Sequence, residues 1–405
     1  MIARRDVLTG LGALGAAALL PGRIALAAAP TDRRLVLVIL RGGLDGLAAV
    51  PPYADENYRR LRPNIAVARP GAADGALDLD GYFGLHPALK TLHTLYREKR
   101  LAIVPAFGGL DRSRSHFDAQ DVLENGTPIP HGSPDGWLNR ALAQMTGRGE
   151  RLGLAVGSGV PLVLRGGVAV RSWEPTALPS ADAAFLDRLE ALYKHDPTFA
   201  RTMREARASA KVASAALGVP EQRGLNNDMA RRAPGNQAYR LLAEATGKLL
   251  ADPNGPRIAV LEANGWDTHV NQPGVLGGLL PQLDAGMAAF RTALGAAWTK
   301  TLVVVVTEFG RTARENGGRG TDHGTASTAF LAGGAVNGGR IVGNWPGLAD
   351  TQLFEARDLK ATVEPRRLFK GILREHLGIA DTALEDRIFP NSRAQTPLGG
   401  LVRRG

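Results

Sequence analysis

The chain has 405 residues, 44% of them hydrophobic and 22% charged, which is typical of a folded globular protein and excludes disorder as its main state. Lys and Arg (49) outnumber Asp and Glu (39), so the formal charge is +10 at pH 7. There is no cysteine, which excludes disulfides, thiolate-bound metals, iron–sulfur clusters and cysteine nucleophiles. Any metal must therefore be held by nitrogen and oxygen ligands.

The first 29 residues have the composition of an export signal. The pair Arg4–Arg5 precedes a short apolar run, and a stretch of small residues follows it. This order is typical of a secretory signal, and the paired arginines resemble the twin-arginine type. We therefore expect residues 1–29 to be removed after Ala27 or Ala29, leaving a periplasmic protein with no stable membrane span. An amphipathic helix or an uncleaved anchor is the alternative.

Apolar runs and helical periodicity alternate along the rest of the chain. Continuous apolar runs predict buried strands at 33–40, 101–104, 257–261, 301–307 and 327–332. Helical spacing predicts helices at 87–97, 236–250 and 281–298. The alternation indicates an α/β fold with a largely parallel sheet. We expect a single domain over 30–405, in which residues from about 107 to 255 form a less regular, partly helical insertion.

Polar side chains follow four of the predicted strands. In parallel sheets ligands bind beyond the carboxyl ends of the strands, so these side chains are candidates for a shared site. They are Asp45 after the first strand, Ser115 after the second, Asp267 and His269 after the third, and Glu308, Asp322 and His323 after the fourth. Together they predict a site of oxygen and nitrogen ligands for divalent metal ions.

Each of these residues also has a purely structural interpretation. Asp45 stands in a Gly-rich turn, where aspartate is common, and Ser115 precedes a helical segment as an N-cap does. Glu308 ends a very apolar strand, so it must pair with an arginine such as Arg311 or bind a metal. A serine at a helix start can also act as an activated nucleophile, so capping and catalysis are compatible.

Four motifs carry a resemblance to one family. They are RGGLDG at 41–46, SHFDAQ at 115–120, GWDTH at 265–269 and TEFGRT at 307–312. They resemble the successive motifs of the exported bacterial family called domain of unknown function 1501, which is grouped with the alkaline phosphatases and sulfatases. The resemblance covers nearly the whole mature chain. It implies a three-layer, alkaline-phosphatase-like fold in which helices cover both faces of a mostly parallel central sheet.

The same resemblance implies roles for individual residues. Two divalent metals would be bridged by the substrate oxyanion, with Asp45 resembling the first metal aspartate and Ser115 the nucleophile. Asp267 and His269 resemble the ligands of one metal, and His323 resembles the late metal histidine. The sulfatase formylglycine motif is missing both as Cys and as Ser-x-Pro-x-Arg, so classical sulfatase chemistry is disfavoured.

Two functions remain open at this stage. The first is an exported metal-dependent hydrolase of phosphate or sulfate esters, in which Ser115 attacks and Arg311 or Arg114 holds the charged group. Its substrate would be an anionic ester or an envelope polymer. The second is a non-catalytic periplasmic binding or scaffold protein with at most one structural metal and a co-encoded partner. No basic-aromatic pattern indicates nucleic-acid binding.

Overall fold

The computed structural model describes residues 32–109, 111–145, 152–157, 159–173, 183–196, 199–200, 203, 207 and 235–403. The signal predicted at 1–29 lies outside these residues. Within the described residues, no helix is both long enough and apolar enough to cross a membrane.

A sheet of eight strands forms the centre of the molecule, in the order β10-β4-β9-β8-β1-β7-β5-β6. The strands are β1 (Arg34–Leu40), β4 (Leu101–Phe107), β5 (Gly153–Val156), β6 (Arg171–Trp173), β7 (Ile258–Ala263), β8 (Thr301–Thr307), β9 (Ser327–Ala332) and β10 (Arg340–Ile341). A separate hairpin pairs β2 (Leu77–Asp78) with β3 (Gly84–Leu85). All five predicted strands are present, so the apolar runs identified the middle of the sheet correctly.

The direction of the strands determines where a site can form. Within the described sheet only β9 runs antiparallel to its neighbours, β4 and β8. The other pairs, including those of β1 with β7 and β8, are parallel. The segments that follow β1, β4, β7 and β8 and the segment that precedes β9 therefore all emerge at one edge of the sheet. We call it the carboxyl edge.

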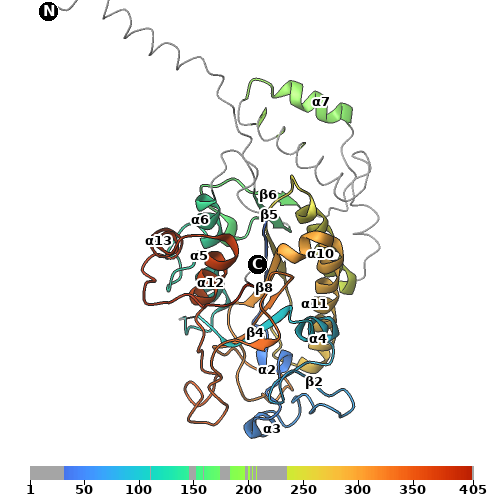
Figure 1. The fold of residues 1–405 in the computed structure, drawn as a ribbon, viewed down its shortest axis with the longest axis vertical. Coiled ribbons are helices and arrows are strands. Elements are labelled where there is room, and N and C mark those ends of the chain that lie inside the picture. Colours follow the sequence, from blue (N-terminus) through green and yellow to red (C-terminus); the bar gives the residue numbers. More distant parts are fainter. Residues whose placement is uncertain are drawn as a thin grey trace, which may run out of the picture.

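Helices cover both faces of the sheet (Figure 1). Side chains alternate between the faces of a strand, and β1 shows the result: Val36 and Val38 pack into one buried cluster, and Leu35 and Leu37 into another. The first cluster includes α4 (Lys90–Arg97), α10 (Gly235–Ala251) and α11 (Gln272–Leu294), and the second α5 (His116–Asn125), α6 (Trp137–Gln144) and α12 (Pro365–Leu377). The predicted α/β fold, with a mostly parallel sheet between two helical layers, is confirmed.

The remaining elements are short. They are α2 (Gly46–Ala49), α3 (Glu56–Leu61), η1 (Leu162–Leu164), α7 (Ala183–Leu192), η2 (Gly295–Lys300), α13 (Asp381–Ala383) and η3 (Leu384–Ile388). The helix predicted at 281–298 in fact begins at Gln272, so Pro281 lies inside α11 rather than at its start. Segment 107–255, predicted as an insertion, contributes β5 and β6 to the sheet beside β7. Most of residues 201–234 within this predicted insertion lie outside the described residues.

Candidate metal centre

Three histidines and one aspartate meet at the carboxyl edge, and we call them the histidine–aspartate cluster: His116, Asp267, His269 and His323. His116 begins α5 after β4, Asp267 and His269 follow β7, and His323 precedes β9. The Nε2 atoms of His269 and His323 lie 3.0 and 3.1 Å from Asp267 Oδ1. The Nε2 atom of His116 lies 3.5 Å from Asp267 Oδ2. The Asp267 carboxylate is therefore the meeting point of three imidazole rings.

The hydrogen bonds at Nδ1 show which ring nitrogen carries the proton. His116 Nδ1 lies 2.9 Å from Glu308 Oε1, and His323 Nδ1 lies 2.9 Å from the carbonyl oxygen of Arg114. A carboxylate and a carbonyl only accept hydrogen bonds, so Nδ1 must donate in both rings. In a neutral ring the lone pair is then on Nε2. His116 and His323 thus both direct an Nε2 lone pair toward Asp267.

His269 repeats this arrangement. Its Nδ1 lies 3.2 Å from Asp322 Oδ1, and its Nε2 lies 3.0 Å from His323 Nε2. With both Nδ1 atoms donating, two neutral rings would point lone pairs at each other across 3.0 Å. Such a contact is favourable only if a cation or a proton lies between the nitrogens. The geometry therefore calls for positive charge at the centre of the cluster.

The cluster meets the requirements of a divalent metal site. Ligand atoms of His116, Asp267 and His323 all lie within 4.8 Å of one another, and His269 contacts two of these residues. Tetrahedral zinc ligands at about 2.0–2.1 Å from the ion lie about 3.3 Å apart, close to the separations seen here. The buried His116 Nε2 atom has no hydrogen-bond partner among the described residues. Metal-binding histidines usually donate their other N–H to a carboxylate or carbonyl, as these three do.

Glu308 and His116 influence each other's protonation. The hydrogen bond to Glu308 is the main cause that raises the pKa of His116. Burial alone would raise the pKa of Glu308, but hydrogen bonds from His116, Gln120 and the backbone outweigh it and lower that pKa. Glu308 is therefore an ionised acceptor, and a cation must compete with a proton for His116 Nε2. Burial lowers the pKa of His323, which favours the neutral, ligand form of that ring.

Arg311 holds the aspartate in place. Its Nη1 donates to Asp267 Oδ1 at 2.6 Å, and its guanidinium is fully buried. Burial would raise the pKa of Asp267, yet the hydrogen bond and the charge of Arg311 lower it. The predicted anion-binding arginine thus contacts a carboxylate of the cluster. The turn after β1 also packs against Asp267. Gly42 in this turn has φ +119°, and a Cβ atom there would lie 2.5 Å from the Asp267 backbone nitrogen.

Asp45 lies in a different, buried network. Its Oδ2 accepts from Arg62 Nη1 at 2.7 Å and from Gln272 Nε2 at 2.5 Å, and its Oδ1 caps α2. Gln272 Oε1 in turn accepts from Thr321, whose hydroxyl accepts from Arg311 Nε. Within the described part of the chain, the Asp45 carboxylate accepts from Arg62, Gln272 and the backbone of α2. The described geometry therefore links Asp45 to the cluster through three intermediate side chains rather than as a direct ligand.

The other predicted residues lie around the cluster. Ser115 is the N-cap of α5, and its hydroxyl accepts from Asp118 N at 3.4 Å, so the cap interpretation is confirmed. Glu308 and Asp322 contact the imidazoles of His116 and His269. Sequence reasoning gave no role to His116 itself. Its position one residue after Ser115, at a strand's carboxyl end, was the available signal.

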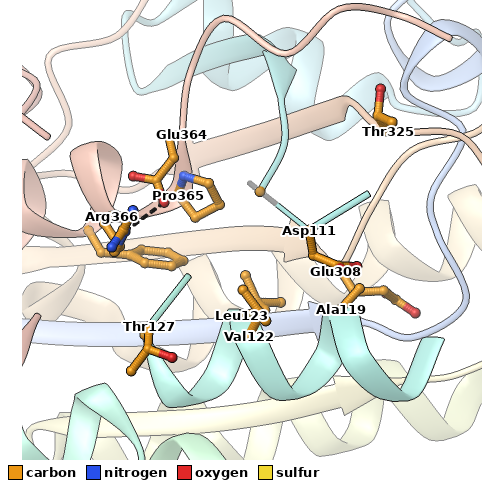
Figure 2. Close-up of a pocket in the computed structure, with 13 residues that line it drawn as sticks. Asp111, Ala119, Val122, Leu123, Thr127, Glu308, Thr325, Glu364, Pro365 and Arg366 are labelled. Atoms are coloured by element: carbon orange, nitrogen blue, oxygen red, sulfur yellow. Dashed lines mark hydrogen bonds and ion pairs between the residues drawn. The ribbon is translucent and has the colours of Figure 1, made fainter. Parts of the chain in front are cut away.

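A small pocket lies between α5, the start of α12 and Glu308 (Figure 2). Its cavity volume is about 20 Å³, which is room for about one water molecule, and Glu308 lies on one side of it. Across from Glu308, Glu364 and Arg366 form an ion pair at the start of α12. Glu364 Oε2 and Arg366 Nη1 are buried and lack a hydrogen-bond partner among the described residues. A buried donor and a buried acceptor of this kind are the groups that ordered water commonly satisfies.

The fold and the cluster define an α/β protein with a candidate metal centre at the carboxyl edge of a mostly parallel sheet. The chain belongs to the family described as "Protein of unknown function (DUF1501)", whose model matches residues 32–388. No curated protein matches the chain.

Several solved structures are partly similar. Ps i-CgsB in complex with k-i-k-neocarrahexaose is 12% identical, with a TM-score of 0.40, and the match covers 77% of this chain and 68% of that one. The phosphonate monoester hydrolase of Agrobacterium radiobacter is 10% identical (TM-score 0.36; 76% and 70% covered). The alkaline phosphatase of the Antarctic bacterium TAB5 is 10% identical (TM-score 0.34; 74% and 90% covered). At these scores the activities of those proteins are not evidence for this one.

Proposed function

We propose that this protein is an exported, metal-dependent hydrolase of phosphate or sulfate esters. The observation that carries the proposal is the convergence of His116, His269 and His323 on Asp267, with every Nδ1 hydrogen already donated elsewhere. The four donor atoms are the nitrogen and oxygen ligands that zinc and similar divalent ions bind. A divalent ion held there supplies Lewis-acid polarisation of a phosphoryl or sulfuryl oxygen.

The chain's own residues would do the remaining work. Ser115 stands at the start of α5, where free backbone N–H groups and the helix dipole favour an anion. In the first step its Oγ bonds to phosphorus or sulfur and the ester's alcohol leaves with the serine proton. In the second step water cleaves the seryl ester, returning the serine hydrogen and releasing phosphate or sulfate. Arg311 fixes Asp267 throughout.

The direct test combines metal content with turnover. The mature protein is purified without chelators or a nickel column, and divalent ions per chain are counted by elemental mass spectrometry. About one ion per chain, together with hydrolysis of a phosphate or sulfate ester, is the expected result. A protein that binds no divalent ion after supplementation with zinc, manganese, magnesium and calcium contradicts the proposal.

A second candidate is a periplasmic binding or scaffold protein with one structural metal. One observation favours it: Asp45, the aspartate expected at a first metal, is paired with Arg62, so the described residues gather one ligand cluster rather than two. Such a protein would keep its metal and bind an envelope polymer or a co-encoded protein without turning over any ester. A stable metal content with no hydrolysis across an ester panel supports this alternative.

Export and location form a separate part of the proposal. The Arg4–Arg5 pair and the apolar run after it support the twin-arginine route to the periplasm. A fusion of residues 1–35 to a reporter that functions only after folded export tests the route. We expect export to stop when both arginines are replaced by lysine.

A further inference from the structure

A further pocket lies outside the histidine–aspartate cluster, between α10, α11 and the end of β7. Its cavity volume is about 180 Å³, and none of the cluster residues lines it. The side chains around it are mostly apolar or aromatic: Ala238, Tyr239, Leu242, Ala263, Trp266, Leu279 and Leu283. Apolar cavities of about 150 Å³ accept a benzene-sized ring. The pocket therefore has room for a molecule of one ring.

The two aromatic walls of this pocket are held in place by the surrounding fold. The backbone N–H of Trp266 donates to the carbonyl oxygen of Arg41 at 3.2 Å, in the turn after β1. A Cβ atom at Gly286 would lie 2.3 Å from Tyr239 Cε1, so the tyrosine ring lies directly against α11. Trp266 and Tyr239 are 2% and 8% exposed. Both rings are thus fixed before a ligand arrives, which lowers the entropy cost of binding.

Trp266 brings a hydrogen-bond donor without an acceptor to this pocket. Its Nε1 atom is buried and has no hydrogen-bond partner among the described residues. An indole nitrogen only donates, so water or a ligand must supply the acceptor. A buried donor left unpaired costs stability, and an acceptor in the pocket removes that cost. Cavities with mostly apolar walls hold water poorly, which favours an organic ligand over water.

The charges around the pocket favour a neutral ligand. Among the described residues that line it, Glu262 is the one charged side chain, and it pairs with Arg41. Arg41 also pairs with Glu124 at 2.6 Å, so this group has no positive charge left for an anion. An ammonium group offers no acceptor to the Trp266 N–H. A neutral molecule with an acceptor oxygen fits both conditions.

We propose that this pocket binds a neutral, ring-sized carbonyl compound, such as a cyclic ketone or a lactone, whose oxygen accepts the Trp266 N–H. The apolar side chains cover the ring and the indole fixes its orientation, as in other small-molecule sites with few polar groups. The inference does not depend on the metal or on ester hydrolysis, because no cluster residue lines the pocket.

The test compares two rings that differ in one group. Cyclohexanone and methylenecyclohexane have nearly the same shape, but only the ketone has an acceptor oxygen. Binding of each to the mature protein is measured by ligand-observed NMR titration. We expect cyclohexanone to bind with a Kd of about 1 mM, about fivefold more tightly than the alkene. In Trp266→Phe, which keeps an aromatic wall but loses the N–H, the two rings should bind equally.

A second variant tests the location of the site. Ala238→Phe fills the pocket from an exposed position on α10 and should abolish the binding of both rings. Ala296→Phe is the matched control, because Ala296 is also exposed but lies in η2, outside the lining, and it should leave both affinities unchanged. Urea unfolding checks that the variants are folded.

Three results overturn the proposal. The first is a wild-type protein that binds neither ring at about 10 mM, which means that water alone satisfies the indole. The second is a ketone preference that survives Trp266→Phe. The third is binding that survives Ala238→Phe, which places the rings elsewhere on the protein.

Discussion

Glu308 Oε1 accepts the Nδ1 hydrogen of His116 at 2.9 Å, and this bond determines which nitrogen His116 turns toward Asp267. The same oxygen also accepts from Gly42 N and Gln120 Nε2. Glu308 directly follows the central strand β8, which ends at Thr307, so the end of the strand fixes where its backbone lies. The orientation of His116 is therefore built into the framework of the fold.

Glu308→Gln tests this role. The amide keeps the size of the side chain but loses the charge that orients and polarises His116. Loss of such a partner typically weakens metal binding by about 10–100-fold. A competition titration against a chromophoric chelator measures the change. Glu56→Gln, an exposed position on α3, is the control, and equal affinities in the two variants would contradict the role given to Glu308.

Metal removal should destabilise the wild-type protein. The cluster joins three segments far apart in the chain, so it exists only in the folded state, and binding to that state stabilises it. At a free metal concentration of about 100 times Kd the gain is about 2.7 kcal/mol. Urea unfolding with and without chelator measures it. In the double variant Asp267→Asn/His323→Ala the chelator should have no effect; a persistent effect would place the metal elsewhere.

Two substitutions at Ser115 distinguish a catalytic role of this residue from its role as a helix cap. Ser115→Ala removes both the hydroxyl nucleophile and the N-cap, which costs about 1 kcal/mol of stability. Ser115→Asn keeps a cap of similar quality but has no hydroxyl. A hydrolase should lose turnover by about 1,000-fold or more in both variants, whereas unfolding should change only in the alanine variant. Turnover that survives in Ser115→Asn would exclude Ser115 as the nucleophile.

Asp45 should behave as a structural residue. Removing one partner of a buried ion pair costs about 3–5 kcal/mol, because the other charge stays buried without compensation. Asp45→Asn should therefore lower the free energy of unfolding by about that much through its effect on Arg62, which is fully buried. Its metal content per folded chain should match that of the wild type. A stable Asn variant with less metal would identify Asp45 as a ligand after all.

His376 should make the protein acid-sensitive. Burial lowers the pKa of His376 in the folded state to about 4, and its Nε2 donates to the Arg34 carbonyl at 2.8 Å. The unfolded chain, with a pKa near 6.5, takes up the proton first as pH falls. The contribution of His376 to stability is therefore lost between about pH 6.5 and pH 4, and it amounts to about 3 kcal/mol. His376→Gln should reduce this slope in urea titrations, whereas the exposed His195→Gln should leave it unchanged.

Much of the cluster could be predicted because its polar side chains come after buried strands in the sequence. Asp267, His269 and His323 were identified from strand-end position alone, since parallel strands deliver their following residues to one edge. Glu308 and Asp322 were expected beside the metal as ligands. Sequence spacing does not show whether a carboxylate binds a metal ion directly or accepts a hydrogen bond from the Nδ1 atom of a metal-binding histidine. Glu308 and Asp322 both contact the Nδ1 atom of a histidine, of His116 and His269 respectively.

The environment of Asp45 was beyond sequence reasoning for a different reason. Its partners Arg62 and Gln272 carry no pattern that marks them, and they reach Asp45 only through tertiary packing. His116 was missed because the adjacent Ser115, as a cap or a nucleophile, already explained a polar side chain at this strand end. Strands β5 and β6 are short and lack a long apolar run, so the sheet's outer edge was not anticipated.

The order of the sheet has a consequence for how the protein is made. Strand β1 pairs with β7 and β8, so that Leu35 lies beside Ile258 and Leu302. On the ribosome, the first strand must wait without its partners until most of the chain has been synthesised. Such distant pairing makes folding slow and leaves an apolar strand open to aggregation meanwhile. The yield of folded protein should therefore depend on chaperones that cover this strand until β7 and β8 have been synthesised.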